Sequence, residues 1–582
     1  MIAKQLIEPK SIVVVGGSDD IHKPGGTVLR NLQDGNFKGS LYVVNPKMDE
    51  VQGIKAYRDV KDLPEVDCAI LAIAAKFCPS TVEVLAKQKN TKAFIILSAG
   101  FHEENEEGAK LERQIVETIN SVGGSLIGPN CIGVLTNHYS GVFTSPIPEL
   151  NPQGVDLISG SGATALFIMD SGMQKGIKFN SMYSVGNSAQ LGVEEILEYM
   201  DESFDPKTSS RVKLLYVESI EKPEKLLKHA SSLIRKGCRI AAVKSGGSAA
   251  GSRAASSHTG ALASSDVAVE ALFRKAGIVR CNGRDELMTV AGIFMHPEMK
   301  GRNMAVVTHA GGPAVMLTDA LSNGGMDVPH IEGEKAQELL GKLFAGSSVG
   351  NPIDFLATGT AEQLGYILDA CDRDFDNIDG MAVIFGSPGL FPVFDVYNVL
   401  DEKMKTSKKP IFPIFPSSKI VKDEIAEFVS KGRVYFPDEV LFGNALCKIY
   451  KTPAPQPEHF EMPDMDVKKI REVVDNAQNG YLSPDEIHTL LDAAGVARAK
   501  EGVSDNEEEI VKMAKEIGLP LVMKVVGPIH KSDVGGVVLN VSDEETVRRE
   551  FKRMMQIKDT YAIMLAQQLS GTQVFIGAKR DD

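Results

Sequence analysis

The segment from Lys244 to Ala263 holds the residues best suited to chemistry. It reads KSGGSAAGSRAASSHTGALA and follows an apolar run at 240–243 that is typical of a buried parallel strand. Small residues let backbone amides approach an anion closely, and the Ser, Thr, Lys and Arg side chains add hydrogen-bond donors. Within this segment, His258 is the side chain that can act as a nucleophile near neutral pH without a special activator. The pattern predicts a histidine that accepts a phosphoryl group, and a surface loop with an incidental histidine is the alternative.

The seven cysteines are the other candidate nucleophiles. They are scattered and form no CxxC pair, so neither a metal cage nor a disulfide framework is expected, and a reducing cytosol fits. Cys131, in the sequence PNCIG, is a candidate catalytic thiol, although a small buried residue is the favoured interpretation.

Composition and charge narrow the function classes. The 582 residues are 43% hydrophobic, which is enough to build the cores of several domains. The net charge is −14, and no basic stripe with interleaved aromatic residues occurs, so nucleic acid and anionic membranes are not expected as the main partners. No apolar run reaches spanning length, and the N-terminus MIAKQLIEPK lacks the apolar core of a signal peptide. These features predict a cytoplasmic protein.

The first 130 residues alternate apolar runs with helical or polar sequence. A strand at 11–15 runs into GGSDDIHKPGG at 16–26, and a helical pattern begins at Thr27. Further strands are expected at 41–44, 68–74 and 94–97, which predicts a doubly wound α/β domain. In such sheets the ligand lies at the carboxyl ends of the strands. The glycine spacing is not a clean GxGxxG, and no Walker pattern occurs in the chain.

Two further α/β domains are predicted, and each begins with a strand that runs into a Gly-rich helix start. The first such turn follows the strand 155–159 and reads GSGATA, and the second follows 304–308 and reads HAGGPA. GSGATA formally matches GxGxxA, the dinucleotide-binding fingerprint. The acidic residue that such a site has some 20 residues further on is missing. Two helix N-termini aimed at one phosphate would together stabilise it by roughly 1–4 kcal/mol. Other strands of these domains are expected at 181–185, 212–217, 381–385 and 410–415.

The remaining sequence predicts a linker and a final domain. Residues 452–466, TPAPQPEHFEMPDMD, contain several prolines and acids without periodicity, so we expect a mobile linker there. Ser483 and Pro484 begin a helix, and strands are expected at 519–526, 537–541 and 574–578.

Five motifs spread over nearly the whole chain carry a family resemblance. They are VGN at 185–187, SSHTGALA at 256–263, TxAGGP at 308–313, NPID at 351–354 and IHKSDVGGV at 529–537. With these motifs the chain resembles the NDP-forming acyl-CoA synthetases, which include ADP-forming acetate–CoA ligase and are similar to succinyl-CoA synthetase. The resemblance implies an α/β fold with a Rossmann-like CoA-binding domain at 1–145, a flavodoxin-like domain with the phosphohistidine at 146–297, a second flavodoxin-like ligase domain at 298–451, a linker at 452–467 and an α+β partial ATP-grasp domain at 468–582.

The resemblance also implies roles for individual residues. The phosphohistidine of the family matches His258, and the acid that holds its other ring nitrogen matches Glu218, which would otherwise be interpreted as a rim carboxylate. His530 matches a histidine thought to relay phosphate in some members, and Lys524 matches a nucleotide-contacting lysine. The helix starts that hold the phosphate match Ser159, Gly160, Ser161, Gly162, Ala163, Gly311, Gly312 and Ala314. The residues expected to bind coenzyme A are Gly16, Gly17, Ser18, Lys23, Gly25, Gly26, Asn45, Pro46, Lys47, Ala74, Ala75, Ser98, Ala99, Asn130 and Cys131.

Two features depart from the family pattern. Gln573 stands where relatives usually have Glu, and the sequence ends before the carboxylates with which an ATP-grasp domain normally binds magnesium. We therefore expect a complete acyl-CoA half and an incomplete nucleotide half, with the metal ligands unassigned.

The reaction implied by the resemblance is acyl-CoA + ADP + Pi ⇌ carboxylate + CoA + ATP, with Mg²⁺, through an acyl phosphate and a phosphohistidine. A homodimer acting on small molecules is expected. The alternative is a non-catalytic acyl-CoA-binding or regulatory module of an acetyltransferase-like protein, and the pair His258 and Glu218 favours the enzyme. A third interpretation, an NAD-linked dehydrogenase, is supported only by the Gly-rich turns. The sequence does not distinguish ADP from GDP, nor one acyl group from another.

Overall fold

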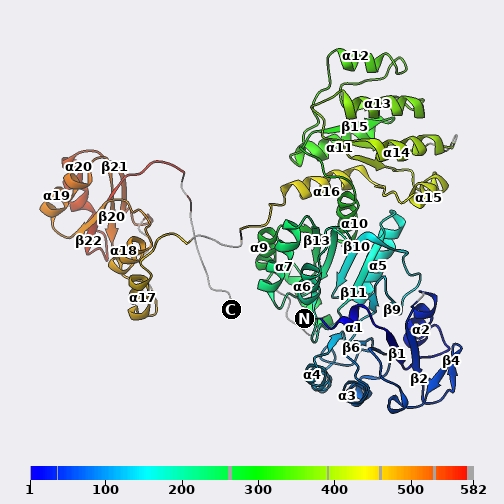
Figure 1. The fold of residues 1–582 in the computed structure, drawn as a ribbon. Coiled ribbons are helices and arrows are strands. Elements are labelled where there is room, and N and C mark those ends of the chain that lie inside the picture. The colour runs from blue at the N-terminus through cyan, green and yellow to red at the C-terminus, as the bar shows by residue number, and fades with distance from the viewer. Residues whose placement is uncertain are drawn as a thin grey trace. The chain divides into compact units, whose positions relative to one another are not determined.

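The fold was analysed in a computed structural model that describes residues 2–35, 37–259, 265–387, 389, 392–457, 462–480, 482–527, 532–572 and 574. The chain divides into two compact units, Met1–Glu458 and His459–Asp582. The first unit contains three sheets and the second contains one (Figure 1). Within the described residues, no helix combines the length and the apolar character needed to cross a membrane.

The first sheet has the strand order β3-β4-β2-β1-β5-β6-β7, and it is parallel apart from the β3–β4 hairpin. Alternate residues of β1 enter different cores: Ile12 and Val14 pack with α2, whereas Val13 and Val15 pack with α3 and α4. Helices therefore cover both faces of the sheet (Figure 1), as doubly wound folds require. The elements are α1 Lys4–Ile7, β1 Ser11–Val15, α2 Pro24–Asp34, β2 Ser40–Val44, β3 Glu50–Val51, β4 Ile54–Tyr57, β5 Cys68–Leu71, α3 Cys78–Gln88, β6 Ala93–Ile96, α4 Glu106–Ser121 and β7 Ser125–Ile127.

The second sheet has the order β14-β13-β12-β10-β11-β8-β9. Its parallel core is extended by β8, which runs antiparallel to β11, so residues 133–142 join this sheet although they lie within the range expected for the first domain. Asn31 of α2 donates its amide to the carbonyl oxygens of Val142 and Thr144, at 2.6 and 2.8 Å, which ties the two sheets together. The elements are β8 Gly133–Leu135, β9 Ser140–Val142, β10 Leu150–Ser159, α5 Gly162–Gln174, β11 Phe179–Ser184, α6 Val193–Glu202, β12 Val212–Val217, α7 Pro223–Arg235, β13 Arg239–Lys244, α8 Ala249–Thr259, α9 Asp266–Ala276, β14 Val279–Cys281 and α10 Arg284–Phe294.

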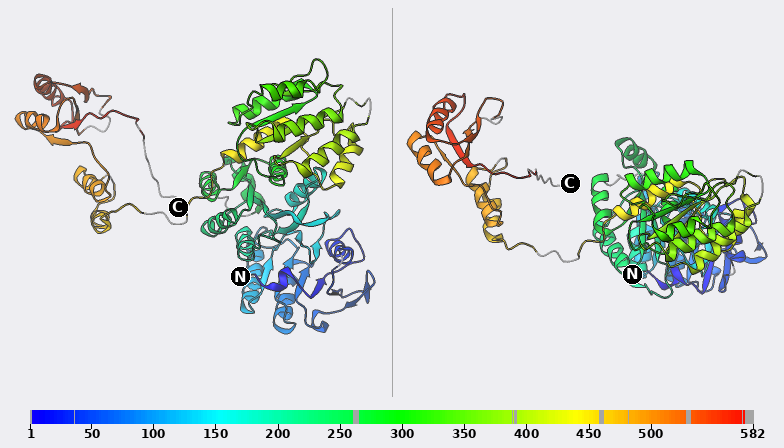
Figure 2. Two further views of the ribbon diagram at one scale, coloured as in Figure 1. Left: turned by 45° about the horizontal axis from the view of Figure 1, so that its top comes forward. Right: turned by 90° about the horizontal axis from the view of Figure 1, so that it is seen from above.

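The third sheet is parallel with the order β16-β15-β17-β18, and helices surround it in both views of Figure 2. One of its faces shares a hydrophobic core with the second domain, in which Leu157 and Leu214 belong to the same cluster as Met304 and Phe412. The second and third domains are therefore packed into one body. The elements are β15 Met304–Thr308, α11 Gly311–Asn323, α12 Glu334–Leu340, β16 Ile353–Asp354, α13 Ala361–Arg373, β17 Gly380–Ile384, α14 Phe394–Thr406, β18 Ile411–Ile414, α15 Lys422–Ser430 and α16 Glu439–Lys451.

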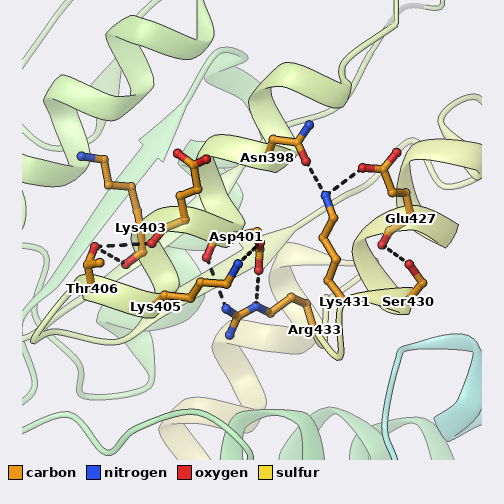
Figure 3. Close-up of polar contacts among 10 residues, drawn as sticks. Asn398, Asp401, Lys403, Lys405, Thr406, Glu427, Ser430, Lys431 and Arg433 are labelled. Carbon is orange, nitrogen blue, oxygen red and sulfur yellow. Dashed lines mark hydrogen bonds and ion pairs between the residues drawn. The ribbon is translucent and has the colours of Figure 1, made fainter.

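A cluster of charges holds the loop after α15 against α14 (Figure 3). Asp401 is buried and accepts hydrogen bonds from Lys405 Nζ and Arg433 Nε, both at 2.6 Å. Burial raises the pKa of Asp401, but its bonds to Lys405 and Arg433 outweigh this and hold the pKa below its ordinary value. The same loop contacts α5, because the amide of Tyr435 donates to the Lys175 carbonyl at 3.2 Å. The loop thus links the third sheet to the helix whose other end forms the candidate site.

The second unit is a four-stranded antiparallel sheet with the order β19-β22-β20-β21. Helices α19 and α20 pack on it through Ile510, Val511, Val547 and Phe551. The elements are α17 Val467–Asn476, α18 Pro484–Ala493, β19 Glu501–Ser504, α19 Glu507–Ile517, β20 Leu521–Val526, β21 Val537–Val541, α20 Glu544–Met554 and β22 Ala562–Gln567.

Several expectations differ from the structure. Helix α2 begins at Pro24 and not at Thr27, and β10 begins at Leu150, before the strand expected at 155–159. Residues 249–259 form helix α8 and not a loop. The first linker residues are held on the first unit, because the Gln456 amide donates to the Lys275 carbonyl at 3.0 Å. The strand expected at 574–578 lies, except for its first residue, outside the described residues.

Candidate active site

A cavity of about 330 Å³ lies where strand ends of the first and second sheets meet. The loops after β6, β7, β10, β11 and β12 line it, together with the start of α6. Parallel strands bring their carboxyl ends to one edge, which explains why residues far apart in sequence converge here. The predicted site residues that line it are Asn130, Cys131, Gly160, Ser161, Gly162, Ala163 and Glu218.

The turn from β10 to α5 is fixed by its own hydroxyl groups. Ser159 Oγ donates to the Ser161 carbonyl at 2.7 Å and accepts from the Ser161 amide at 3.2 Å. Ser161 is the N-cap of α5, and its Oγ accepts from the Thr164 amide at 3.4 Å. A Cβ atom at Gly162 would lie 2.6 Å from Ile132 Cγ2, so glycine is needed for this close packing. The turn places the N-terminus of a 13-residue helix, with its partial positive charge, at the cavity wall.

The VGN motif packs backbone to backbone against the loop that contains Cys131. Gly186 has φ +54°, and a Cβ there would lie 2.2 Å from the Pro129 carbonyl oxygen. The Asn187 amide donates to that same oxygen at 2.9 Å. The close approach at Gly186 therefore packs a loop of the second sheet against a loop of the first. The Asn187 side chain is available for hydrogen bonds to other residues.

The loop after β12 carries Glu218 and is held by an acid of α6. Glu194, which is buried, accepts at Oε1 from the amides of Glu221 and Lys222, at 2.9 and 3.1 Å. The next residue, Glu195, pairs with Lys222 Nζ at 2.8 Å. Burial raises the pKa of Glu195, but the bond to Lys222 outweighs this and the pKa lies below its ordinary value. The sequence signal for this role was the pair of acids in the first turn of a helix that follows Gly192.

Sequence reasoning missed a histidine of the cavity wall and two acids that bond to residues of that wall. His102 lines the cavity, and its Nδ1 lies 2.8 and 2.9 Å from the two carboxylate oxygens of Glu112. Asn187 Nδ2 donates to Glu112 Oε2 at 3.2 Å and also to Glu103. Burial raises the pKa of Glu103, but the hydrogen bonds from Asn187 and the Gly100 amide outweigh this and lower it. The VGN asparagine thus connects the second domain to the acids of the first.

The Cys131 thiol is buried and donates to the Ile96 carbonyl at 3.4 Å. Burial raises its pKa to about 12, so the thiol stays protonated at neutral pH. Cys131 therefore fits the favoured interpretation of a small buried residue and not that of a catalytic thiol.

The turn from β15 to α11 has the same hydroxyl geometry as the α5 turn. Thr308 Oγ1 donates to the Ala310 carbonyl at 2.8 Å and accepts from the Ala310 amide at 2.9 Å. The N-cap Ala310 offers no side-chain bond. Gly311, Gly312 and Ala314 do not line the 330 Å³ cavity, and Ala314 is buried in the core shared by the second and third domains.

The segment around His258 begins beside the α5 turn. A second cavity, of about 480 Å³, is lined by residues 244–248 together with Thr164 of α5. Lys244 Nζ donates to the Gly246 carbonyl at 2.9 Å, and burial lowers the Lys244 pKa. The backbone of His258 belongs to α8, whereas its side chain lies outside the described part of the structure. His530 is likewise outside the described residues, and Lys524 lies half-buried in β20 of the second unit.

The expected coenzyme A residues share the carboxyl edge of the first sheet. Gly16 has φ +88°, and a Cβ at Gly25 would lie 2.1 Å from the Gly16 carbonyl oxygen, so α2 starts directly against the turn. Asn45 Nδ2 donates to the Gly17 carbonyl at 2.8 Å. The other candidates at this edge and at the start of α2 are Ser18, Lys23, Gly26, Pro46, Lys47, Ala74, Ala75, Ser98 and Ala99.

Comparison with known families and proteins agrees with this architecture. A CoA binding domain model matches residues 10–137, a model of the succinyl-CoA ligase like flavodoxin domain matches 152–294, and an ATP-grasp domain model matches 473–582. Acetate–CoA ligase [ADP-forming] I of Archaeoglobus fulgidus is 32% identical over 99% of this chain and 84% of the relative. The 4-hydroxybutyrate–CoA ligase [ADP-forming] of Nitrosopumilus maritimus is 29% identical over 100% of this chain and 85% of the relative.

Among solved structures, the dinucleotide forming acetyl-coenzyme A synthetase 1 of Ca. Korarchaeum cryptofilum, in complex with phosphate and ADP, is similar to this chain. It aligns with a TM-score of 0.69 and 26% identity over 77% of this chain and 96% of that chain. Fold, site and comparisons together define an acid–thiol ligase that acts on acyl-CoA. The chain belongs to the family of NDP-forming acyl-CoA synthetases, which confirms the expected fold class and enzyme class.

Proposed function

We propose that the chain interconverts acyl-CoA, ADP and phosphate with a carboxylate, CoA and ATP through an acyl phosphate and a phosphohistidine at His258. The observation that carries this proposal is the 330 Å³ cavity, in which the loops of the CoA-binding domain meet the α5 turn and Glu218. The relatives named ADP-forming CoA ligases support the overall reaction. We propose a cytoplasmic homodimer as the working form.

In the first step, phosphate attacks the acyl carbon of the thioester, and CoA leaves. The cavity residues Gly160–Ala163 lie at the N-terminus of α5, where free amides and the helix dipole favour an anion. An anion at one such helix end is stabilised by about 0.3–2 kcal/mol, depending on burial. The α11 turn, with residues 311–314, is the proposed second holder of the phosphate during the later steps.

In the second step, His258 takes the phosphoryl group from the acyl phosphate and releases the carboxylate. Glu218 accepts a hydrogen bond from Nδ1–H of His258, which leaves Nε2 as the attacking atom, and its charge stabilises the imidazolium that forms. Glu218 lines the same cavity as the α5 turn, and the segment that leads to His258 lines the neighbouring cavity with Thr164.

In the third step, the phosphoryl group passes to the nucleoside diphosphate in the second unit. Dividing one transfer into two suits a donor site and an acceptor site that belong to different domains. We propose that Lys524 contacts the nucleotide and that His530 relays the phosphoryl group. We propose that Mg²⁺ accompanies the nucleotide. In the described ranges, no group of three His, Cys, Asp or Glu side chains that could hold the ion occurs.

The test is labelling of the protein with radioactive phosphate in the presence of acetyl-CoA and without nucleotide. We expect an acid-labile, base-stable label that disappears in His258→Ala. His330→Ala is the matched control, because His330 is exposed and belongs to neither cavity. A label that survives in His258→Ala would place the acceptor elsewhere, and no label in the unchanged protein would contradict the proposed reaction.

A further inference from the structure

The wall of the 330 Å³ cavity includes a histidine that the steps above leave unused, and this histidine is paired with a carboxylate. His102 follows β6, and Glu112 lies in α4, so both belong to the first domain. Both Glu112 oxygens lie within 2.9 Å of His102 Nδ1, and the two side chains are 29% and 12% exposed. Because Nδ1 is engaged by Glu112, the nitrogen that His102 retains for the cavity is Nε2.

The pair is held in place from both sides of the cavity. Asn187, from the second domain, donates to Glu112 Oε2 at 3.2 Å. Glu103 on the loop of His102 and Glu221 on the loop after β12 are the other charged groups that act on the ring, together with Glu112 on α4. The hydrogen bond to Glu112 raises the His102 pKa above its ordinary value, while burial opposes this. A carboxylate on Nδ1–H and a free Nε2 are the arrangement of a general base.

The thiol of coenzyme A is a group from which such a base could remove a proton. In the thioester-forming direction its thiol must lose a proton before the sulfur attacks, since the thiolate is the nucleophile. In the opposite direction the thiolate that leaves must gain a proton. The first domain, which matches a CoA binding domain, supplies His102 and Glu112 themselves.

We propose that His102, oriented by Glu112, is the acid–base catalyst for the thiol of coenzyme A, an inference that rests on the proposed function. His102 Nε2 takes the S–H proton, and the resulting thiolate forms a bond to the acyl carbon of the acyl phosphate. The carbon–oxygen bond to phosphate then breaks, and the phosphate leaves as HPO₄²⁻ with the proton returned from His102. Glu112 stays ionised throughout and stabilises the imidazolium. In the reverse reaction the imidazolium protonates the departing sulfur.

Acetyl phosphate separates this step from the histidine transfer. With CoA it reports the formation of acetyl-CoA, and with its phosphorus labelled and no CoA it reports phosphorylation of the protein. We expect His102→Gln to slow acetyl-CoA formation by about 100-fold or more. Phosphorylation of the protein and calorimetric CoA affinity should stay unchanged. His138→Gln is the control, because His138 is exposed and does not line the cavity.

Two further readouts distinguish acid–base catalysis from a structural role. The rate of acetyl-CoA formation should rise with pH as His102 loses its proton, and Glu112→Gln should move the midpoint to lower pH, since it removes the carboxylate that raises the pKa. Added imidazole should restore part of the rate in His102→Ala. Equal loss of both reactions in His102→Gln, or no effect on either, would overturn the proposal. An unchanged protein that performs neither reaction would instead contradict the proposed function.

Discussion

The second and third domains build the same strand-to-helix turn, but the acids beside the two turns come from different neighbouring strands: Glu218 follows β12, whereas Asp354 belongs to β16. In both, the last hydroxyl residue of the strand, Ser159 or Thr308, bonds the residue two positions later. In the strand pairing, Ser159 lies opposite Tyr216, and Thr308 lies opposite Ile384. Two residues further on, after the end of the strand, the residue is Glu218 in the second domain and Gly386 in the third.

This difference assigns different chemistry to the two turns. Beside the α11 turn, His309 Nε2 lies 2.9 Å from both the amide nitrogen and the carbonyl oxygen of Gly386, so the Gly386 backbone contacts an imidazole ring at this position. Around the α5 turn, Glu218 offers a carboxylate that can orient and stabilise a cationic imidazole. We therefore propose that Glu218, on the α5 side, gives the acid–base support of His258, and that the α11 turn holds phosphate through its amides.

The largest expected effect comes from removing the acid beside the α5 turn. Glu218→Gln should slow phosphorylation of the protein by roughly 30- to 1000-fold, a loss of about 2–4 kcal/mol of transition-state stabilisation. CoA binding should remain intact. Single-turnover labelling from acetyl-CoA and phosphate measures this rate. Glu221→Gln removes the same charge from the same cavity, and an equal loss there would show that the position of Glu218 is not special.

A smaller effect is expected from adding a methyl group at the first helical residue of each turn. Gly162→Ala places a Cβ 2.6 Å from Ile132 Cγ2, whereas Gly311→Ala places one 3.7 Å from Asp354 Oδ2. We expect a destabilisation of about 1–3 kcal/mol from overpacking at Gly162 and little change at Gly311. Thermal unfolding of the two variants measures this difference, and equal melting temperatures would refute the tighter packing of the α5 turn.

The smallest effects come from exchanging the helix caps. Ser161→Ala removes the hydroxyl that accepts from the Thr164 amide, which should cost about 0.5–2 kcal/mol. Ala310→Ser introduces a cap where α11 has none and should stabilise by a similar or smaller amount. Urea denaturation should shift in opposite directions for the two variants. A shift in the same direction would show that the two helix starts are less alike than their hydroxyl bonds indicate.

Local sequence signals predicted much of the fold. The strands Ser11–Val15, Val212–Val217, Met304–Thr308 and Val537–Val541 were predicted to the residue, because each is an apolar run bounded by polar or glycine residues. Strand β8 was missed because it is three residues long and is defined by its pairing with β11. The linker prediction missed the hydrogen bond between the backbones of Gln456 and Lys275, because amino-acid composition does not reveal a contact with a distant residue.

The site was predicted where a strand end or a glycine turn marks it. The turn at 159–163 was found because it follows an apolar strand, whereas Glu218 was assigned through the family resemblance. The structure brings residues 160–163 and Glu218 to one cavity. His102, Glu112 and Glu194 were missed, since a local pattern does not reveal their partners in separate elements. The acids that follow Gly192 mark a helix start but not the loop that Glu194 holds. The roles of the predicted CoA and phosphate residues stay predictions.

The central claim is that the phosphoryl group rests on His258 after the acyl-CoA half reaction. Mass-spectrometric mapping of the labelled protein, digested under alkaline conditions that preserve phosphohistidine, tests it most directly. We expect the modified peptide to contain His258 and the peptide with His530 to be unmodified in the absence of nucleotide. A phosphate found on His530, or on a residue other than histidine, with His258 unmodified would contradict the account.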